Sequence, residues 1–159
     1  MLLAPTTQTG LDGTPPSTCC SYWRSTASLG DRPLTAYGVL SRGLLSGHWS
    51  KERDVSKDFR GVSPRFQGEN LDHNLQLVET LRAVASEAGA TPAQAAIAWA
   101  LSRGDDIVPL IGARRRERLE EALQALELQI DTDRIEAAVP ADAAAGSRYP
   151  AAQMSHLPA

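Results

Sequence analysis

The sequence contains few cysteines, no long apolar run and no excess of charge of one sign. The two cysteines, Cys19 and Cys20, are adjacent and have no Cys or His at metal-site spacing, so we expect neither a disulfide framework nor a bound metal. No segment approaches the length of a membrane span, and the first residues lack the basic start and apolar stretch of a signal peptide. The formal net charge of -3 gives no support to nonspecific binding of nucleic acid or of anionic membranes. A soluble cytoplasmic protein is the expectation.

Residues 1–33 differ from the rest of the chain. About half of them are Pro, Gly, Ser or Thr, and neither a helical nor a strand period is visible. Little apolar surface is available there to offset the entropy of ordering, so the segment is predicted to be irregular or disordered. The 159 residues suffice for one ordinary domain. We place that domain at residues 34–139 and expect residues 140–159 to be a coil tail.

Two helices have clear signals in the middle of the chain. Apolar residues recur at helical spacing over residues 70–88, and Gly89 is placed to end that helix. Thr91 and Gln94 form a capping-box pattern with a proline between them, which predicts a helix that runs to residue 103.

Two more helices are predicted further along. The first covers residues 115–126, and the second runs to residue 139 from Asp131, which can serve as its cap. The residues of the first that are expected to face inward are Leu119, Ala122, Leu123 and Leu126.

Short apolar segments at residues 34–37 and 107–108 are predicted strands. Between them, residues 40–47 are expected to form a loop that enters a short helix, and residues 48–68 an unstructured loop or lid. Alternation of short strands with amphipathic helices predicts parallel βα units. Two strands alone cannot form a stable parallel sheet, because both faces and both edges need cover, so we expect part of a larger fold.

A basic turn follows the second strand. Arg114, Arg115 and Arg116 are expected in the first turn of a helix, where the helix dipole disfavours cations. The free backbone N–H groups at a helix start favour phosphate, so the pattern is compatible with an anionic ligand. A solvated basic turn is an equally simple interpretation.

Three segments in order resemble the aldo-keto reductase family. The resembling segments are Thr35–Gly47, Thr91–Ala100 and Asp106–Glu121. They are similar to the seventh-strand segment, the helix before the eighth strand and the NADPH adenosine signature of that family. The resemblance covers residues 34–139 and implies an α/β fold, an incomplete (β/α)8 TIM barrel that is helix-rich and comprises the last two βα units plus a C-terminal helix. A complete barrel needs about 250 residues, more than this chain has.

The resemblance also assigns cofactor-binding roles one position at a time. Tyr37 matches the aromatic residue that stacks on nicotinamide, and the loop under the pyrophosphate matches Gly38, Val39, Leu40, Ser41 and Arg42. Gly38 and Val39 stand where the family often has serine and proline, so a hydroxyl contact to phosphate is in doubt.

The adenosine end of the cofactor is matched by four residues. Gly112 and Arg114 match the turn at the ribose and its 2′-phosphate, Arg118 the arginine beside adenine, and Glu121 the carboxylate that accepts from the adenine amino group. Guanidinium suits these roles because it binds phosphate through paired hydrogen bonds and stacks on rings. Ala122 replaces the asparagine common in the family. Read without the resemblance, Tyr37 would be a core aromatic, and Arg118 and Glu121 an ordinary exposed ion pair.

The catalytic residues implied by the family have no match here. Its tyrosine, lysine, aspartate and histidine lie in the first half of the barrel, and neither Tyr22 nor His48 stands in a corresponding motif. The expectation is therefore the C-terminal portion of an NADPH-dependent reductase of aldehydes or ketones, inactive alone, with self-association through exposed strand edges. The alternatives are a nonenzymatic cofactor-binding subunit, as in the potassium-channel β subunits that resemble the same family, and a truncated gene product without function.

Overall fold

The computed structural model describes residues 33–50 and 52–154. Its regular elements are β1 (Leu34–Ala36), η2 (Ser41–Ser46), η3 (Phe59–Val62), η4 (Pro64–Phe66), α2 (Gly68–Glu87), α3 (Pro92–Leu101), β2 (Ile107–Pro109), α4 (Arg116–Gln124), α5 (Thr132–Ala138) and α6 (Ala151–Met154). Except for Pro33, the segment predicted to be irregular, with Cys19, Cys20 and Tyr22, lies outside the described residues.

The two strands pair in parallel, as the alternation of strands and helices predicts. Leu34 is opposite Ile107 and Ala36 is opposite Pro109. The pairing continues one residue further, where the Leu110 amide donates to the Ala36 carbonyl at 2.8 Å. The carboxyl ends of both strands therefore lie at the same edge, which is where the segments predicted to bind the cofactor begin.

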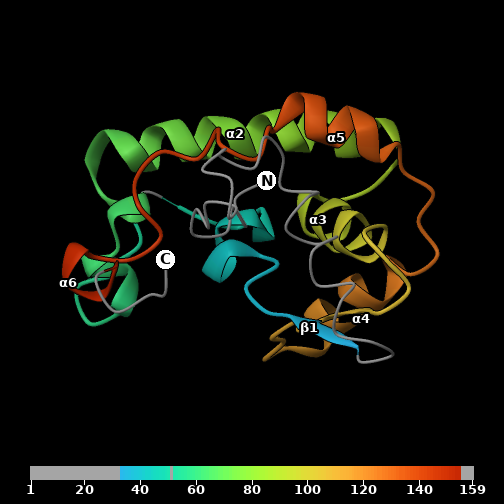
Figure 1. Cartoon of the computed structure of the whole chain (residues 1–159), viewed down its shortest axis with the longest axis horizontal. Helices are drawn as coiled ribbons and strands as arrows, with labels where there is room; N and C mark the ends of the chain where they lie inside the picture. Colours follow the sequence, from blue (N-terminus) through green and yellow to red (C-terminus); the bar gives the residue numbers. More distant parts are fainter. Residues whose placement is uncertain (1–32, 51, 155–159) are drawn as a thin grey trace, which may run out of the picture.

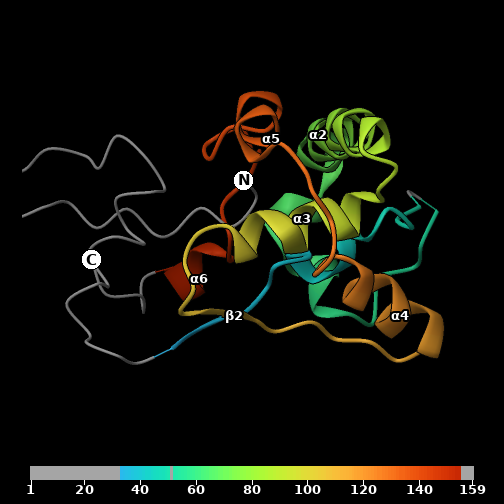
Figure 2. The ribbon, with the colours of Figure 1, turned by 90° about the vertical axis from the view of Figure 1, so that its right-hand side faces the viewer.

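Helix α3 is the centre of the described fold. It lies between the sheet and the neighbouring helices α2 and α5, in both views of the chain (Figures 1 and 2). Every residue from Pro92 to Ala100 is buried, and most are alanine, so neighbouring elements can approach its backbone closely. The main core side chains around it are Val39, Leu44, Leu45, Leu81, Ile135 and Val139.

The predicted caps are present. Thr91 and Gln94 form the full capping box, with the Gln94 amide donating to Thr91 Oγ1 at 3.2 Å and the Thr91 amide to Gln94 Oε1 at 2.8 Å. The Asp131 carboxylate accepts from the amides of Asp133 and Arg134, both at 3.1 Å. These two helices begin at residues 92 and 132 because their first backbone donors are satisfied there.

Helix α4 differs from its prediction in two ways. It starts at Arg116, since Arg115 is extended and serves as the N-cap without a side-chain hydrogen bond, so Arg114 lies outside the first turn. The leucines predicted to face inward are instead exposed, at 51% for Leu119, 53% for Leu123 and 64% for Leu126. A helical period identifies an apolar face, but it does not supply an element to cover it.

Segments 48–68 and 140–154 are more ordered than predicted. The first contains η3 and η4, with Ser63 and Phe66 buried, and Phe66 packs at 4.9 Å between ring centroids against Trp49. The second was predicted to be coil, but it ends in α6 and its backbone is bound by α2: Asn74 Nδ2 donates to the Ala145 carbonyl, and the Ala145 amide donates to Asn74 Oδ1. Side chains distant in sequence supply these bonds, so local patterns do not predict them. No helix in residues 33–50 and 52–154 is long and apolar enough to cross a membrane.

Candidate functional site

The loop after β1 has an unusual backbone. Gly38 has a φ of 74°, and a Cβ there would meet no atom within 4 Å, so backbone conformation rather than space favours glycine where the family often has serine. Ser41 and Arg42 have φ values of 47° and 58°, which non-glycine residues seldom adopt. Strain of this kind costs on the order of 1 kcal/mol or more per residue and is found preferentially at functional sites.

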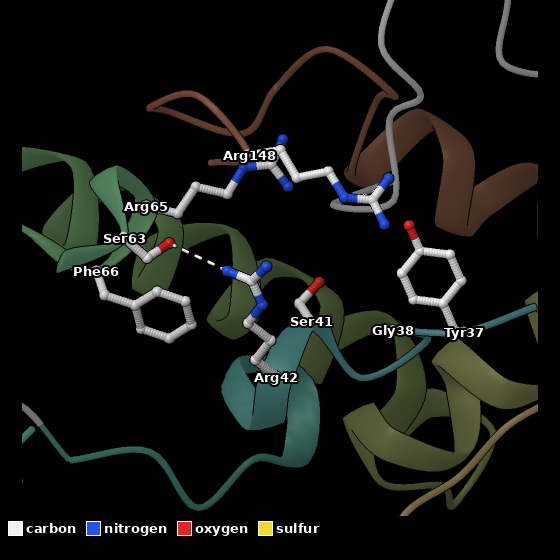
Figure 3. Close-up of a pocket in the computed structure, with 8 residues that line it drawn as sticks. All are labelled: Tyr37, Gly38, Ser41, Arg42, Ser63, Arg65, Phe66 and Arg148. Carbon is white, nitrogen blue, oxygen red and sulfur yellow. Dashed lines mark hydrogen bonds between the residues drawn. The ribbon is translucent and has the colours of Figure 1, made fainter. Parts of the chain in front are cut away.

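A first pocket, of about 100 Å³, lies above this loop. It brings together four of the predicted residues, from the loop after β1 and from η2, with side chains from η4, the residue before it and the C-terminal segment (Figure 3). Its lining comprises Tyr37, Gly38, Ser41, Arg42, Ser63, Arg65, Phe66 and Arg148. The lining therefore contains three guanidinium groups, and no carboxylate is among the described residues that form it.

Contacts within the first pocket orient its arginines. Arg42 Nη1 donates to Ser63 Oγ at 3.3 Å, and its guanidinium carbon lies 4.4 Å from the centroid of the Phe59 ring. The Arg42 carbonyl accepts from Arg60 Nη1 at 3.1 Å. Ser41 Oγ is buried and has no hydrogen-bond partner. A buried hydroxyl without a partner is costly, and a ligand that bonds to it would remove that cost.

Tyr37 forms a pair with Tyr149 at the rim of this pocket. Tyr37 is 59% exposed, and the guanidinium carbon of Arg148 lies 5.1 Å from its ring centroid. The hydrogen bond between the two phenols, together with burial, raises the pKa of Tyr37, whereas the same hydrogen bond lowers the pKa of Tyr149.

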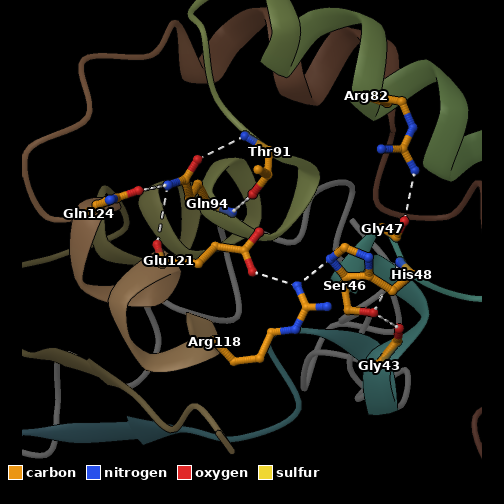
Figure 4. Close-up of polar contacts among 10 residues, drawn as sticks. All are labelled: Gly43, Ser46, Gly47, His48, Arg82, Thr91, Gln94, Arg118, Glu121 and Gln124. Carbon is orange, nitrogen blue, oxygen red and sulfur yellow. Dashed lines mark hydrogen bonds and ion pairs between the residues drawn. The ribbon is translucent and has the colours of Figure 1, made fainter. Parts of the chain in front are cut away.

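A second pocket, of about 440 Å³, lies between η2, α3 and α4. Arg118 and Glu121, one turn apart on α4, lie in it and pair at 3.0 Å between Arg118 Nη1 and Glu121 Oε2 (Figure 4). Arg118 also donates to Nε2 of His48, which follows η2. The Arg118 guanidinium is thus held at the mouth of the pocket by partners from two elements.

Gln94 fixes the wall of the second pocket. Beyond its capping role, its Nε2 donates to the Glu121 carbonyl at 3.2 Å and to Gln124 Oε1 at 2.9 Å. The residue is buried, so these bonds hold the body of α4 against the start of α3. The capping signal that predicted the helix therefore also positions Arg118 and Glu121.

The predicted residues divide among four places. Tyr37, Gly38, Ser41 and Arg42 line the first pocket, whereas Arg118 and Glu121 line the second. Val39 is in the core and Leu40 packs against it, so these two support the loop rather than face a ligand. Gly112 and Arg114 are exposed in the turn before α4 and line neither pocket.

Several residues of the two pockets were not predicted from the sequence. Arg65 and Arg148 line the first pocket from segments predicted to be loop and coil, Tyr149 lies against Arg148, and His48 lines the second pocket. The sequence Gly146-Ser-Arg-Tyr149 places a glycine before a basic and an aromatic residue. This pattern could have indicated that the segment, which we predicted to be coil, contributes to a site. No group of three or more His, Cys, Asp or Glu among the described residues is arranged to hold a metal ion.

Comparison with known proteins identifies the family to which the chain is similar. A family model described as the Aldo/keto reductase family matches residues 24–141, so the match also includes the last residues of the 1–33 segment. The chain is 36% identical over 121 residues to the NADP(+) aldo-keto reductase yakc of Schizosaccharomyces pombe and 36% identical over 119 residues to a Glycine max protein named "Probable aldo-keto reductase 1". These alignments cover 74% and 73% of this chain.

The relatives are much longer than the matched region. The chain spans about a third of their length, 36% and 34% respectively. Among solved structures, a glycerol dehydrogenase from Gluconobacter oxydans is similar in fold, with a TM-score of 0.65 at 24% identity over 74% of this chain and 36% of that one. The match of the family model across most of the described residues shows that this chain belongs to the aldo/keto reductase family.

Proposed function

We propose that this chain is the cofactor-binding portion of an NADPH-dependent aldo-keto reductase that acts on an aldehyde or ketone. The observation that carries the proposal is the pair of pockets on either side of η2. One contains Tyr37 and Arg42, and the other contains Arg118 and Glu121. A relative at 36% identity is named for NADP(+), which supports a nicotinamide cofactor.

The side chains present fit the groups of such a cofactor. When bound, NADPH would supply hydride to a carbonyl carbon. Arg118 would stack on or bond to the adenine, Glu121 would accept from its amino group, and Arg114 would reach the 2′-phosphate. The exposed ring of Tyr37 offers a flat surface for the nicotinamide, and the unpartnered Ser41 hydroxyl offers a bond to phosphate.

We also propose that the fold is part of a barrel and that the chain has no reductase activity by itself. We infer an incomplete (β/α)8 barrel because the described sheet has two strands and leaves Val108 and Leu110 exposed. A general acid within reach of the carbonyl oxygen is required for reduction, and no position matches the family tetrad. Residues 34–159 would then need the rest of a barrel to reduce a substrate, and unpaired strand edges would favour self-association.

The test is a calorimetric titration of the full chain with NADPH and NADH. We expect Arg118→Ala to weaken NADPH binding about tenfold or more, because a charged hydrogen bond is lost. Arg114→Ala should reduce the preference for NADPH over NADH. The control is Arg116→Ala, since Arg116 is 85% exposed and pairs only with Glu120 among the described residues. Equal affinity for the two cofactors in the wild type would contradict a role for Arg114 at the 2′-phosphate.

A nonenzymatic cofactor-binding subunit is the second candidate, because the two pockets contain predicted cofactor-binding residues and no residue that matches the catalytic tetrad. The two functions separate when the chain is supplied with the N-terminal half of a related barrel and assayed for carbonyl-dependent NADPH oxidation. Recovered turnover that depends on Arg118 supports the enzyme. Tight NADPH binding without any recovered turnover supports the subunit.

A further inference from the structure

Residues 140–150 place the side chain of Arg148 beside the loop after β1. Asn74, fully buried, donates from Nδ2 to the carbonyls of Arg65 and Ala145, both at 3.0 Å, and its Oδ1 accepts from the Ala145 amide at 2.9 Å. His73 Nε2 lies 2.8 Å from the Ala143 carbonyl. These bonds fix the segment against α2, three residues before Arg148.

The turn that precedes Arg148 is also closely packed. Gly146 has a φ of 81°, and a Cβ there would lie 3.0 Å from the Pro64 carbonyl and from Asn70 Nδ2. Its carbonyl accepts from Arg65 Nε at 3.3 Å. Arg65 is therefore bonded to the same segment that presents Arg148, and both side chains reach the first pocket (Figure 3).

Three guanidinium groups then face one small cavity. Burial lowers the pKa of Arg65, and the neighbouring charges of Arg148 and Arg42 lower it further. Like charges that line one small site repel one another, and an anion bound between them would lower that repulsion. The buried Ser41 hydroxyl without a partner and the strained backbone at Ser41 and Arg42 are at the same place.

We propose that Arg148 joins Arg42 and Arg65 in a three-arginine site for a phosphoryl group, with Ser41 Oγ as a further hydrogen-bond partner. Planar guanidinium groups bind phosphoryl oxygens through paired hydrogen bonds, and the cavity of about 100 Å³ is of a size for one small group rather than a whole nucleotide. The contribution of the C-terminal segment is the new element, since neither Arg65 nor Arg148 was marked by the family resemblance.

The phosphoryl group has two sources with the same chemistry. It is the pyrophosphate of the dinucleotide, in which case the site rests on the proposed function, or it belongs to free phosphate or to a phosphorylated carbonyl compound. The test therefore uses three probes: inorganic pyrophosphate, NADPH, and adenosine 2′-monophosphate, which lacks the pyrophosphate. Binding of each to the full-length chain is measured by calorimetry.

Arg148→Ala and Arg65→Ala are expected to weaken pyrophosphate binding about tenfold or more, because each removes charged hydrogen bonds. Neither should change the affinity for adenosine 2′-monophosphate, and Arg116→Ala should change none of the three. If Arg148→Ala lacks the circular dichroism spectrum of the wild type, Arg148→Gln, which keeps the aliphatic part of the side chain and an N–H donor but removes the charge, is used instead and should show the same loss.

The outcomes separate this inference from the proposed function. If Arg148→Ala and Arg65→Ala weaken the binding of both pyrophosphate and NADPH, the cofactor is the source of the phosphoryl group. If the variants bind pyrophosphate more weakly while NADPH does not bind or binds as it does to the wild type, the three-arginine site is supported and its ligand is another phosphorylated compound. Pyrophosphate that fails to bind the wild type, or binds it and both folded variants within twofold, overturns the three-arginine site even where Arg118 is needed for NADPH.

Discussion

Ser41 and Arg42 show how much of the candidate site depends on single residues. Both are held in a left-handed conformation between Gly38 and Gly43, which are also left-handed. Glycines at 38 and 43 are a sequence signal for a sharp loop, but a positive φ at serine and arginine is not, because local propensity disfavours it. The prediction of a loop that enters a short helix at residues 40–47 is confirmed, and only the fold shows that the Arg42 side chain faces the first pocket.

Asp58 makes the clearest pH-dependent contribution at the residue scale. Its carboxylate accepts from Arg60 Nε at 2.8 Å and from the Arg60 amide at 3.1 Å, and these bonds lower its pKa to about 2. Because the folded pKa is below the unfolded one, the stabilisation is complete above about pH 4 and is lost as the pH falls towards 2. Arg60 also donates a hydrogen bond to the Arg42 carbonyl. We therefore expect the first pocket to become less ordered in the same pH range.

We expect acidification to lower the stability of Asp58→Asn less than it lowers the stability of the wild type. Thermal unfolding of this variant should begin at a lower temperature than that of the wild type at pH 7, and the two proteins should converge near pH 2. Asp54→Asn is the control, since Asp54 bonds only to Ser56 in the described contacts. A difference between Asp58→Asn and the wild type that does not shrink on acidification would rule out this role.

At the scale of elements, the sequence predicts where a helix begins better than it predicts which elements the helix packs against. Thr91, Pro92 and Gln94 predicted the start of α3 correctly because a capping box is a local arrangement. The length of α4 and its apolar period were also approximately predicted. What the leucines of α4 face was not, because that depends on elements far away in the sequence.

Thr91→Ala tests the local part of this argument. Loss of the cap should destabilise the chain by about 1 kcal/mol, measured by urea unfolding. Because Gln94 joins the cap to α4, the same change should also weaken the NADPH binding that we propose at Arg118 and Glu121. Thr80→Ala is the matched control, since Thr80 is exposed within α2 and its hydroxyl only bonds back to the Gln76 carbonyl. An unfolding free energy equal to that of the wild type would show that the cap contributes nothing.

At the scale of the whole molecule, the described chain has a core on one side and open apolar surface on the other. Five large apolar side chains are exposed along β2, α4 and the residues that follow each of them, namely Val108, Leu110, Leu119, Leu123 and Leu126. The sequence predicted both the parallel pairing and the need for further cover, since two parallel strands cannot bury their own faces. It could not predict that α4 would be the helix left uncovered.

This open surface predicts self-association that substitution on α4 can reduce. Leu119 and Leu123 are four residues apart, so they form one stripe on the helix. The double variant Leu119→Lys, Leu123→Lys should shift the chain to smaller species in sedimentation velocity at equal concentration, because contiguous exposed apolar surface drives association. Its unfolding free energy should change by no more than about 0.5 kcal/mol, as is usual for surface substitutions. Leu81→Ala, in the core, should instead cost about 3 kcal/mol. If the double variant associates as the wild type does, contact between copies involves another surface, with the strand edges at Val108 and Leu110 as the next to substitute.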